Sequence, residues 1–148
     1  MINLNFFDKS ELELDENIFL GLVQKSEIIL KKILENKLGS EKDGIVNLII
    51  CDDEEIRSYN RDYRKKDYAT DVLSFVYFDD LSDREVIVGD IYISIDTAKI
   101  QAEEKNHSLE KELSILFCHG ILHLMGFDHN NDREEEEMEK FASNILSL

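Results

Sequence analysis

The sequence has no proline, no tryptophan and only two cysteines in 148 residues. Without proline, turns must rest on Gly, Asn, Asp and Ser, so the ends of helices and strands are weakly marked. Two cysteines are too few for a disulfide-rich scaffold, and we expect Cys51 and Cys118 to be reduced, buried thiols. No apolar run approaches the roughly 20 residues that span a bilayer, and the N-terminus lacks the pattern of a signal peptide. We therefore expect a cytoplasmic protein without membrane contacts.

Positive charge is also scarce, with 17 Lys and Arg residues against 33 Asp and Glu residues and a formal net charge of −16. This balance by itself argues against nucleic acid as a partner, and we expect no DNA binding, because phosphate binding depends on Lys and Arg. However, Arg57, Arg61, Arg64, Lys65 and Lys66 lie close together. Composition alone favours an ordinary solvated helix face here, but one local patch can face phosphate while the rest stays acidic.

Hydrophobic periodicity predicts strands and helices along one domain, 1–148. We expect strands at 2–6, 45–51, 72–78 and 86–95, and helices at 15–34, 52–63, 96–105, 108–125 and 132–145. The almost wholly apolar strand 45–51 should be central and covered on both faces. Strands 72–78 and 86–95 should pair. This order predicts an α+β fold in which helices pack on a small mixed sheet of about four strands.

Several single residues carry local predictions. Polar side chains should begin four of the helices: Asp15, Asp52 with Glu55, Ser108, and Asp132 with Glu135. Gly39 should lie just past the end of the first helix. Gly89 should mark a bulge or a close approach of the backbone.

Three of the four histidines lie between positions 119 and 129. On a helix, His119 and His123 project from one face, and Gly126 can end that helix so that His129 approaches the same ion. Three imidazoles with one open position are typical of a catalytic zinc site. We expect one Zn²⁺ per chain at the C-terminal end of the central helix 108–125, although Ni, Co and Cu also accept three histidines. Cys118 points about 100° away from its neighbour His119 and is a poor ligand.

The histidine spacing also matches that of metzincin peptidases, which place a glutamate directly after the first histidine as general base. Here that position is Gly120, which disfavours a peptidase. A metal without that glutamate can still lower the pKa of water and polarise a phosphoryl oxygen. Arg64 or its neighbours can then neutralise charge on the phosphate, so phosphodiester hydrolysis is open to this site.

Two further segments accompany the histidines. Residues 59–75 read Tyr-Asn-Arg-Asp-Tyr-Arg-Lys-Lys-Asp-Tyr-Ala-Thr-Asp-Val-Leu-Ser-Phe, and residues 89–94 read Gly-Asp-Ile-Tyr-Ile-Ser. In order and spacing, these segments and the window 119–129 resemble the three signature blocks of the YbeY family of bacterial endoribonucleases. The resemblance covers nearly the whole chain. It departs at Ala69 and Val76, where the family commonly has proline, and neither change removes a chemical group.

The resemblance implies a metal-dependent endoribonuclease that prefers single strands and acts in ribosomal RNA maturation, notably at the 3′ end of small-subunit rRNA, and in ribosome quality control. It implies that His119, His123 and His129 bind the metal, usually assigned as zinc. It places Arg64 in a cleft opposite the metal, and we expect Arg64 and His119 to be the catalytic residues. The implied partners are single-stranded precursor rRNA and ribosomes, together with ribosomal or assembly proteins.

Other residues carry weaker expectations. Arg61, Arg64, Lys65 and Lys66 should contact RNA, and Asp71, Ser74 and Asp128 should orient the metal ligands. Asp90 also falls in a matching motif position, although short polar residues at strand starts often serve turns and caps.

Three functions remain open at this stage. The first is the endoribonuclease, with either a water-derived hydroxide or the RNA 2′-hydroxyl as the attacking group. The second is a non-enzymatic ribosome-assembly factor in which the metal only stabilises the last helices. The third is a metzincin-like peptidase, disfavoured by Gly120.

Overall fold

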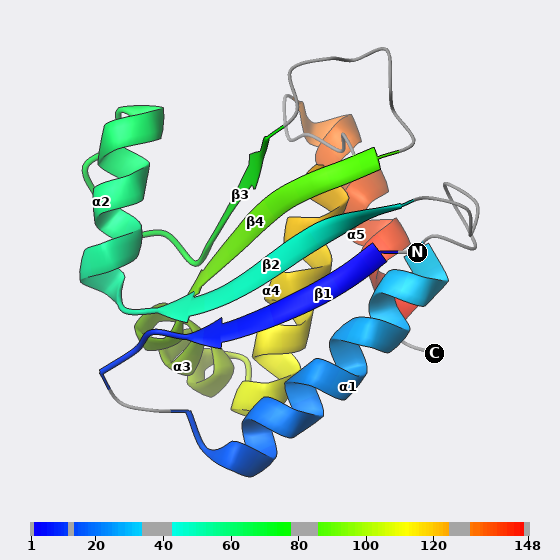
Figure 1. The fold of residues 1–148 in the computed structure, drawn as a ribbon, viewed down its shortest axis with the longest axis horizontal. Coiled ribbons are helices and arrows are strands. Elements are labelled where there is room, and N and C mark those ends of the chain that lie inside the picture. The colour runs from blue at the N-terminus through cyan, green and yellow to red at the C-terminus, as the bar shows by residue number, and fades with distance from the viewer. Residues whose placement is uncertain (1, 12–13, 34–42, 78–85, 125–130, 147–148) are drawn as a thin grey trace.

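A four-stranded sheet forms the centre of the fold (Figure 1). The structure is a computed structural model, and it describes residues 2–11, 14–33, 43–77, 86–124 and 131–146. The strands are β1 (Ile2–Asp8), β2 (Asp43–Cys51), β3 (Val72–Val76) and β4 (Val86–Ser94). The helices are α1 (Glu16–Ile33), α2 (Asp53–Arg64), α3 (Ile95–Glu104), α4 (Leu109–Leu124) and α5 (Asp132–Leu146). The predicted α+β class with a small mixed sheet is confirmed.

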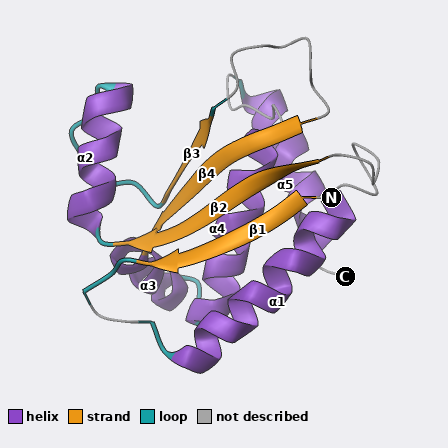
Figure 2. Cartoon of the chain, viewed as in Figure 1, coloured by secondary structure: helices purple, strands orange, loops and turns teal. Residues whose placement is uncertain are grey.

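The sheet has the strand order β1-β2-β4-β3. The β1–β2 and β2–β4 pairs are parallel, whereas β3 is antiparallel to β4 and lies at the edge (Figure 2). The predictions that β2 is central and that β3 pairs with β4 are therefore confirmed.

Helices α1, α4 and α5 cover one face of the sheet, and α4 crosses behind its middle (Figure 1). The core between them is apolar and fully buried, and it includes Leu22, Leu48, Ile91, Leu116 and Phe117. In the described part of the chain, no helix has both the length and the apolar character needed to cross a membrane.

The second face of the sheet is only partly covered. Helix α2 packs there over a small cluster of Cys51, Ile56 and Leu73, on the β3 side of the sheet. The expectation that β2 is covered on both faces is wrong at Ile45, which is 45% exposed. A strand loses water on both faces only where elements lie on both, and α2 does not reach that part of the sheet.

The predicted helix starts are mostly correct. The Asp15 side chain accepts hydrogen bonds from the N–H groups of Asn17 and Ile18, and the Ser108 hydroxyl accepts one from Lys111. Gly39 lies outside the described residues.

Two predicted helix starts are right in position but wrong in their capping contacts. Asp52 precedes α2 as expected, but its carboxylate accepts from the Glu11 N–H instead of capping the helix, so no capping box with Glu55 forms. Asn131 caps α5 in place of Asp132, because its side-chain oxygen accepts from the Glu134 N–H at 2.9 Å. Asp132 becomes the first residue of that helix.

The remaining histidine, His107, takes part in a polar cluster around a buried carboxyl group between α3 and α4. Nε2 of His107 lies 2.6 Å from the carboxyl group of Glu112, whose side chain is fully buried. Lys105 donates to both oxygens of the same carboxyl group, at 3.3 and 3.2 Å. A carboxyl group without water depends on such partners, so this cluster joins the turn after α3 to α4.

The substitution His107→Ala should lower the free energy of unfolding by about 2 to 3 kcal/mol, because the fully buried carboxyl group of Glu112 then loses a short hydrogen bond. Urea denaturation would measure the change. Lys99→Ala, an exposed position on α3, is the control and should stay close to wild type. Equal stability of the two variants would show that the cluster contributes nothing.

Candidate metal centre

The last two turns of α4 carry His119 and His123, both half-buried and one helical turn apart, as predicted. His129 and Asp128 lie outside the described residues, so the third ligand and its neighbour stay predictions. Among the residues that are described, no cluster of three or more metal-ligating side chains forms. The described half of the site is a two-imidazole face at the C-terminal end of the central helix.

The position of α4 against the sheet depends on two glycines. A Cβ on Gly120 would lie 2.7 Å from Cγ2 of Ile91, and a Cβ on Gly89 would lie 2.7 Å from the Phe75 carbonyl oxygen and 2.8 Å from Leu124. The predicted close approach at Gly89 is therefore confirmed. A contact below 3.0 Å forces the neighbours apart, so both positions require glycine for this spacing.

Gly120 also bears on the peptidase alternative. A side chain at this position would start 2.7 Å from Cγ2 of the buried Ile91. A glutamate there would meet the core and not the histidine face. The structure supplies no place for a peptidase general base at this position.

Ser74 fixes the same turn of the helix from the edge strand. Its hydroxyl donates to the Gly120 carbonyl oxygen at 3.0 Å, next to His119 in the chain. This contact ties β3 to the turn that carries the imidazole. It fits the predicted orienting role, which itself stays a prediction.

Neither cysteine is suited to bind the metal. Cys51 and Cys118 are both buried and free, as expected. Burial raises the pKa of each thiol to about 12, so both stay protonated at neutral pH. Metals bind the thiolate, so protonated thiols add no donor to the two imidazoles described on α4.

Arg64 ends α2, on the opposite side of β3 from the histidines. The Tyr59 ring lies 4.6 Å from that of Tyr92, and the Tyr63 ring lies 5.4 Å from that of Phe75. Tyr92 alternates along β4 with Ile91 and Ile93, which face α4, so these rings belong to the other face. Helix α2, which ends at Arg64, and the histidine pair thus lie on the two faces of the sheet beside the edge strand. The cleft between them stays a prediction.

The basic patch, which consists of Arg57, Arg61, Arg64, Lys65 and Lys66, contains cations with and without a carboxylate partner among the described residues. Arg57 binds Asp67 at 2.8 Å and Arg61 binds Asp62 at 3.1 Å. The hydrogen bond from Arg57 holds the pKa of Asp67 below its ordinary value. Arg64, Lys65 and Lys66 are exposed, and no described carboxylate lies within ion-pair distance of them. Positive charge available to a phosphate therefore concentrates at the C-terminal end of α2.

The turn after Arg64 is held by its own hydrogen bonds. Lys65 has a positive φ of 62°, and its N–H donates to the Arg61 carbonyl. The buried Asn60 then donates from Nδ2 to the Tyr68 carbonyl at 2.9 Å. Sequence reasoning missed Asn60, although an amide on the buried side of a predicted helix is the signal that would have identified it.

The acidic motif residues have clear structural partners. Asp71 accepts from the Val72 N–H at 2.8 Å and from Gln101 at 3.3 Å, which joins the start of β3 to α3. Asp90 accepts from Asn47 at 2.9 Å and from Tyr77 at 2.7 Å. Burial and this bond to Asp90 raise the pKa of Tyr77 to about 12, so its hydroxyl remains a donor.

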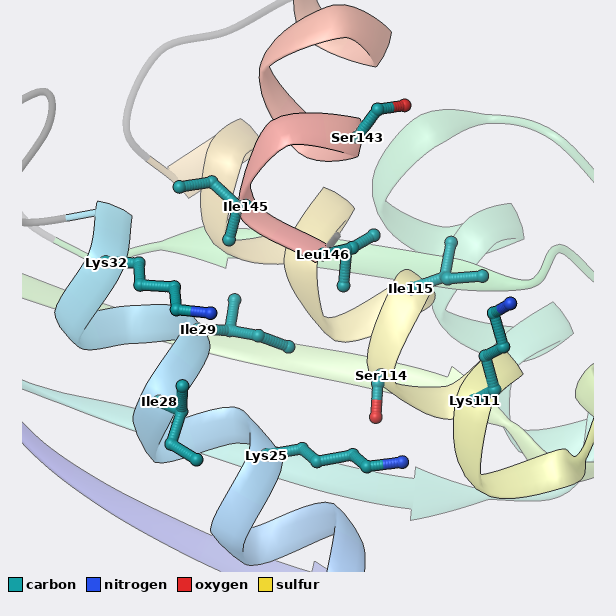
Figure 3. Close-up of a pocket in the computed structure, with 10 residues that line it drawn as sticks. All are labelled: Lys25, Ile28, Ile29, Lys32, Lys111, Ser114, Ile115, Ser143, Ile145 and Leu146. Atoms are coloured by element: carbon teal, nitrogen blue, oxygen red, sulfur yellow. The ribbon is translucent and has the colours of Figure 1, made fainter. Parts of the chain in front are cut away.

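A pocket of about 510 Å³ lies elsewhere, between α1, α4 and α5 (Figure 3). Its lining includes Ile28 and Lys25 from α1, and Lys111 and Ile115 from the N-terminal half of α4. None of the predicted site residues lines it.

Comparisons with known proteins agree on one family. The family model of endoribonuclease YbeY matches residues 10–148. An endoribonuclease YbeY of Alkaliphilus metalliredigens is 40% identical over 131 residues, 84% of each chain. One of Bacillus mycoides is 40% identical over 146 residues, covering 91% of this chain and 88% of the relative. The solution structure of TM1509 from Thermotoga maritima matches with a TM-score of 0.58 and 28% identity, over 97% of this chain and 89% of that one.

Gly120→Ala should lower the free energy of unfolding by about 1 to 3 kcal/mol, because overpacking against Ile91 outweighs the gain in helix propensity. Urea denaturation would measure it. In an Ile91→Ala background the same substitution should cost less, since its steric partner is gone. Gly120→Ala more stable than wild type would contradict the packing explanation.

Proposed function

Because the chain belongs to the YbeY family of endoribonucleases, we propose that it is a metal-dependent endoribonuclease that cuts single-stranded RNA in ribosomal RNA processing. The observation that carries this proposal is the placement of His119 and His123 across the edge strand β3 from Arg64. Its substrate is the precursor of small-subunit rRNA near its 3′ end, with a further role in ribosome quality control. It acts in the cytoplasm on ribosomes, together with ribosomal or assembly proteins.

His119, His123 and His129 hold one Zn²⁺ in this proposal. The donor chemistry supports it, because two imidazoles stand one turn apart on α4. Such an ion, when bound, lowers the pKa of a water molecule and polarises a phosphoryl oxygen. The contact from Ser74 to the Gly120 carbonyl keeps the first imidazole on the side of β3.

Arg64 binds the phosphate whose ester bond is cut. A guanidinium offers two parallel donors to phosphate oxygens, and it neutralises the charge that develops on them. Its helix is anchored by the rings of Tyr59 and Tyr63, so the charge is presented from a fixed element. Lys65 and Lys66 add positive charge at the same end of α2 and bind neighbouring phosphates.

The zinc-loaded protein should cleave a labelled small-subunit precursor rRNA, and His119→Ala, purified in the same way, should have no detectable activity. A chelator should abolish wild-type cleavage and added Zn²⁺ should restore it. Equal activity of wild type and His119→Ala would indicate a contaminating nuclease. No cleavage by either protein, even with ribosomes added, would favour a non-enzymatic assembly factor whose metal stabilises the fold.

Arg64→Ala should reduce kcat by about 10² to 10³-fold, the cost of removing one donor to a developing oxyanion. Arg64→Lys should recover only part of the loss, since an ammonium cannot bind two oxygens in parallel. Arg57→Ala is the matched control, because Arg57 lies on the same helix but is paired with Asp67. An equal reduction of kcat in Arg57→Ala and Arg64→Ala would show that the loss of any positive charge on α2 has this effect and that Arg64 has no special role.

A further inference from the structure

The sheet face that α2 leaves uncovered carries a continuous row of polar side chains. Asn5, Asn47 and Asp90 occupy paired positions on β1, β2 and β4. Nδ2 of Asn5 donates to Oδ1 of Asn47 at 3.1 Å, and Nδ2 of Asn47 donates to Oδ1 of Asp90 at 2.9 Å. The Tyr77 hydroxyl, just after β3, donates to Oδ2 of Asp90 at 2.7 Å. The row crosses β1, β2 and β4, and its members fix one another in place.

A second row lies two residues further along the same strands and is apolar. Phe7, Ile49 and Tyr92 pair across β1, β2 and β4 on the same face. The two rows enclose a hollow of about 260 Å³, which Phe7, Lys9, Asn47, Ile49, Asp90 and Tyr92 line. Phe7 is 49% exposed, so one flat ring faces water beside fixed donors and acceptors.

Aromatic rings connect this hollow to Arg64. Tyr92 contacts Phe75 with ring centroids 5.9 Å apart, and Phe75 contacts Tyr63 at 5.4 Å. Tyr63 directly precedes Arg64 and is 69% exposed. A strand held at Arg64 therefore has an aromatic path across the sheet to the hollow.

We propose that this hollow binds a nucleobase of the single-stranded RNA substrate, at a distance from the phosphate held by Arg64. This inference rests on the proposed function. The base stacks on the ring of Phe7, and its edge meets the amide of Asn47 and the carboxylate of Asp90. Every base has a π-face, and stacking on aromatic side chains is the usual way to hold single strands.

The chemistry of the face selects a base over a phosphate or a basic peptide. Lys9 is the single cation among the residues that line the hollow, and Asp90 repels phosphate. A basic peptide would be repelled by Lys9 and would find a single carboxylate, that of Asp90, among the residues that line the hollow. Flat rings beside amide groups match the flat face and polar edge of a base.

The test uses the full chain, treated with chelator so that RNA is bound and not cut, and a short fluorescent 2′-O-methyl oligoribonucleotide. Titration should shift the side-chain amide NMR signals of Asn5 and Asn47. Phe7→Ala should weaken binding about tenfold, within the range measured for loss of one stacked base. Ile28→Ala is the matched control, because Ile28 is 53% exposed on α1, on the opposite side of the sheet, and should bind as wild type (Figure 3).

A second comparison uses the RNA. In a series of oligonucleotides that each lack one base, one member should bind the wild-type protein about tenfold more weakly than the intact oligonucleotide does. The Phe7→Ala protein should bind that member and the intact oligonucleotide with equal affinity, because the stacking contact is already lost. Unchanged affinity in Phe7→Ala, or amide signals that respond to ribosomal proteins but not to RNA, would overturn the inference. Metal-dependent cleavage by wild type is scored separately. If cleavage persists while these effects are absent, only the base site fails; if wild type never cleaves RNA, the proposed function fails.

Discussion

The close contact between α4 and the sheet sets the position of everything that the site contains. Gly120 lets the helix lie against Ile91, and Gly89 lets β4 accommodate both Leu124 and the carbonyl of Phe75. The Ser74 hydroxyl then joins the edge strand to the Gly120 carbonyl. Because protein interiors are close-packed, a single added carbon at either glycine would move the helix that carries the histidines. The residue type that a peptidase would need at position 120 is excluded by the same contact.

The second face of the sheet carries α2, which ends at Arg64, opposite the imidazoles. Helix α2 has few buried apolar residues, and its contact with the sheet depends on Ile56 and on the rings of Tyr59 and Tyr63. These rings attach it to β3 and β4 and leave the β1 side of the sheet in water. Partial cover therefore leaves an open sheet face beside α2.

Patterns that depend on neighbours in the chain could be predicted from the sequence, whereas those that depend on distant elements could not. The alternation of Ile2, Leu4 and Phe6 and the caps Asp15 and Ser108 are local, and the structure agrees with them. Asp52 failed as a cap because Glu11, far away in the sequence, competes for its carboxylate. The exposed side of β2 likewise follows from which elements meet in space. The positions of His119 and His123 were predictable since a helix fixes the spacing of both.

An endoribonuclease with a net charge of −16 must hold RNA differently from a basic nuclease. Affinity from phosphates alone needs many Lys and Arg residues and weakens steeply with salt. Within the basic patch, the cations that have no carboxylate partner among the described residues lie at the end of α2, and Arg57 and Arg61 are neutralised locally. Contacts to bases can supply the remaining affinity, and they require bases that are not paired. The single-strand preference that we propose is consistent with this charge: a protein that holds few phosphates gains from contacts to bases, whose faces a duplex does not offer.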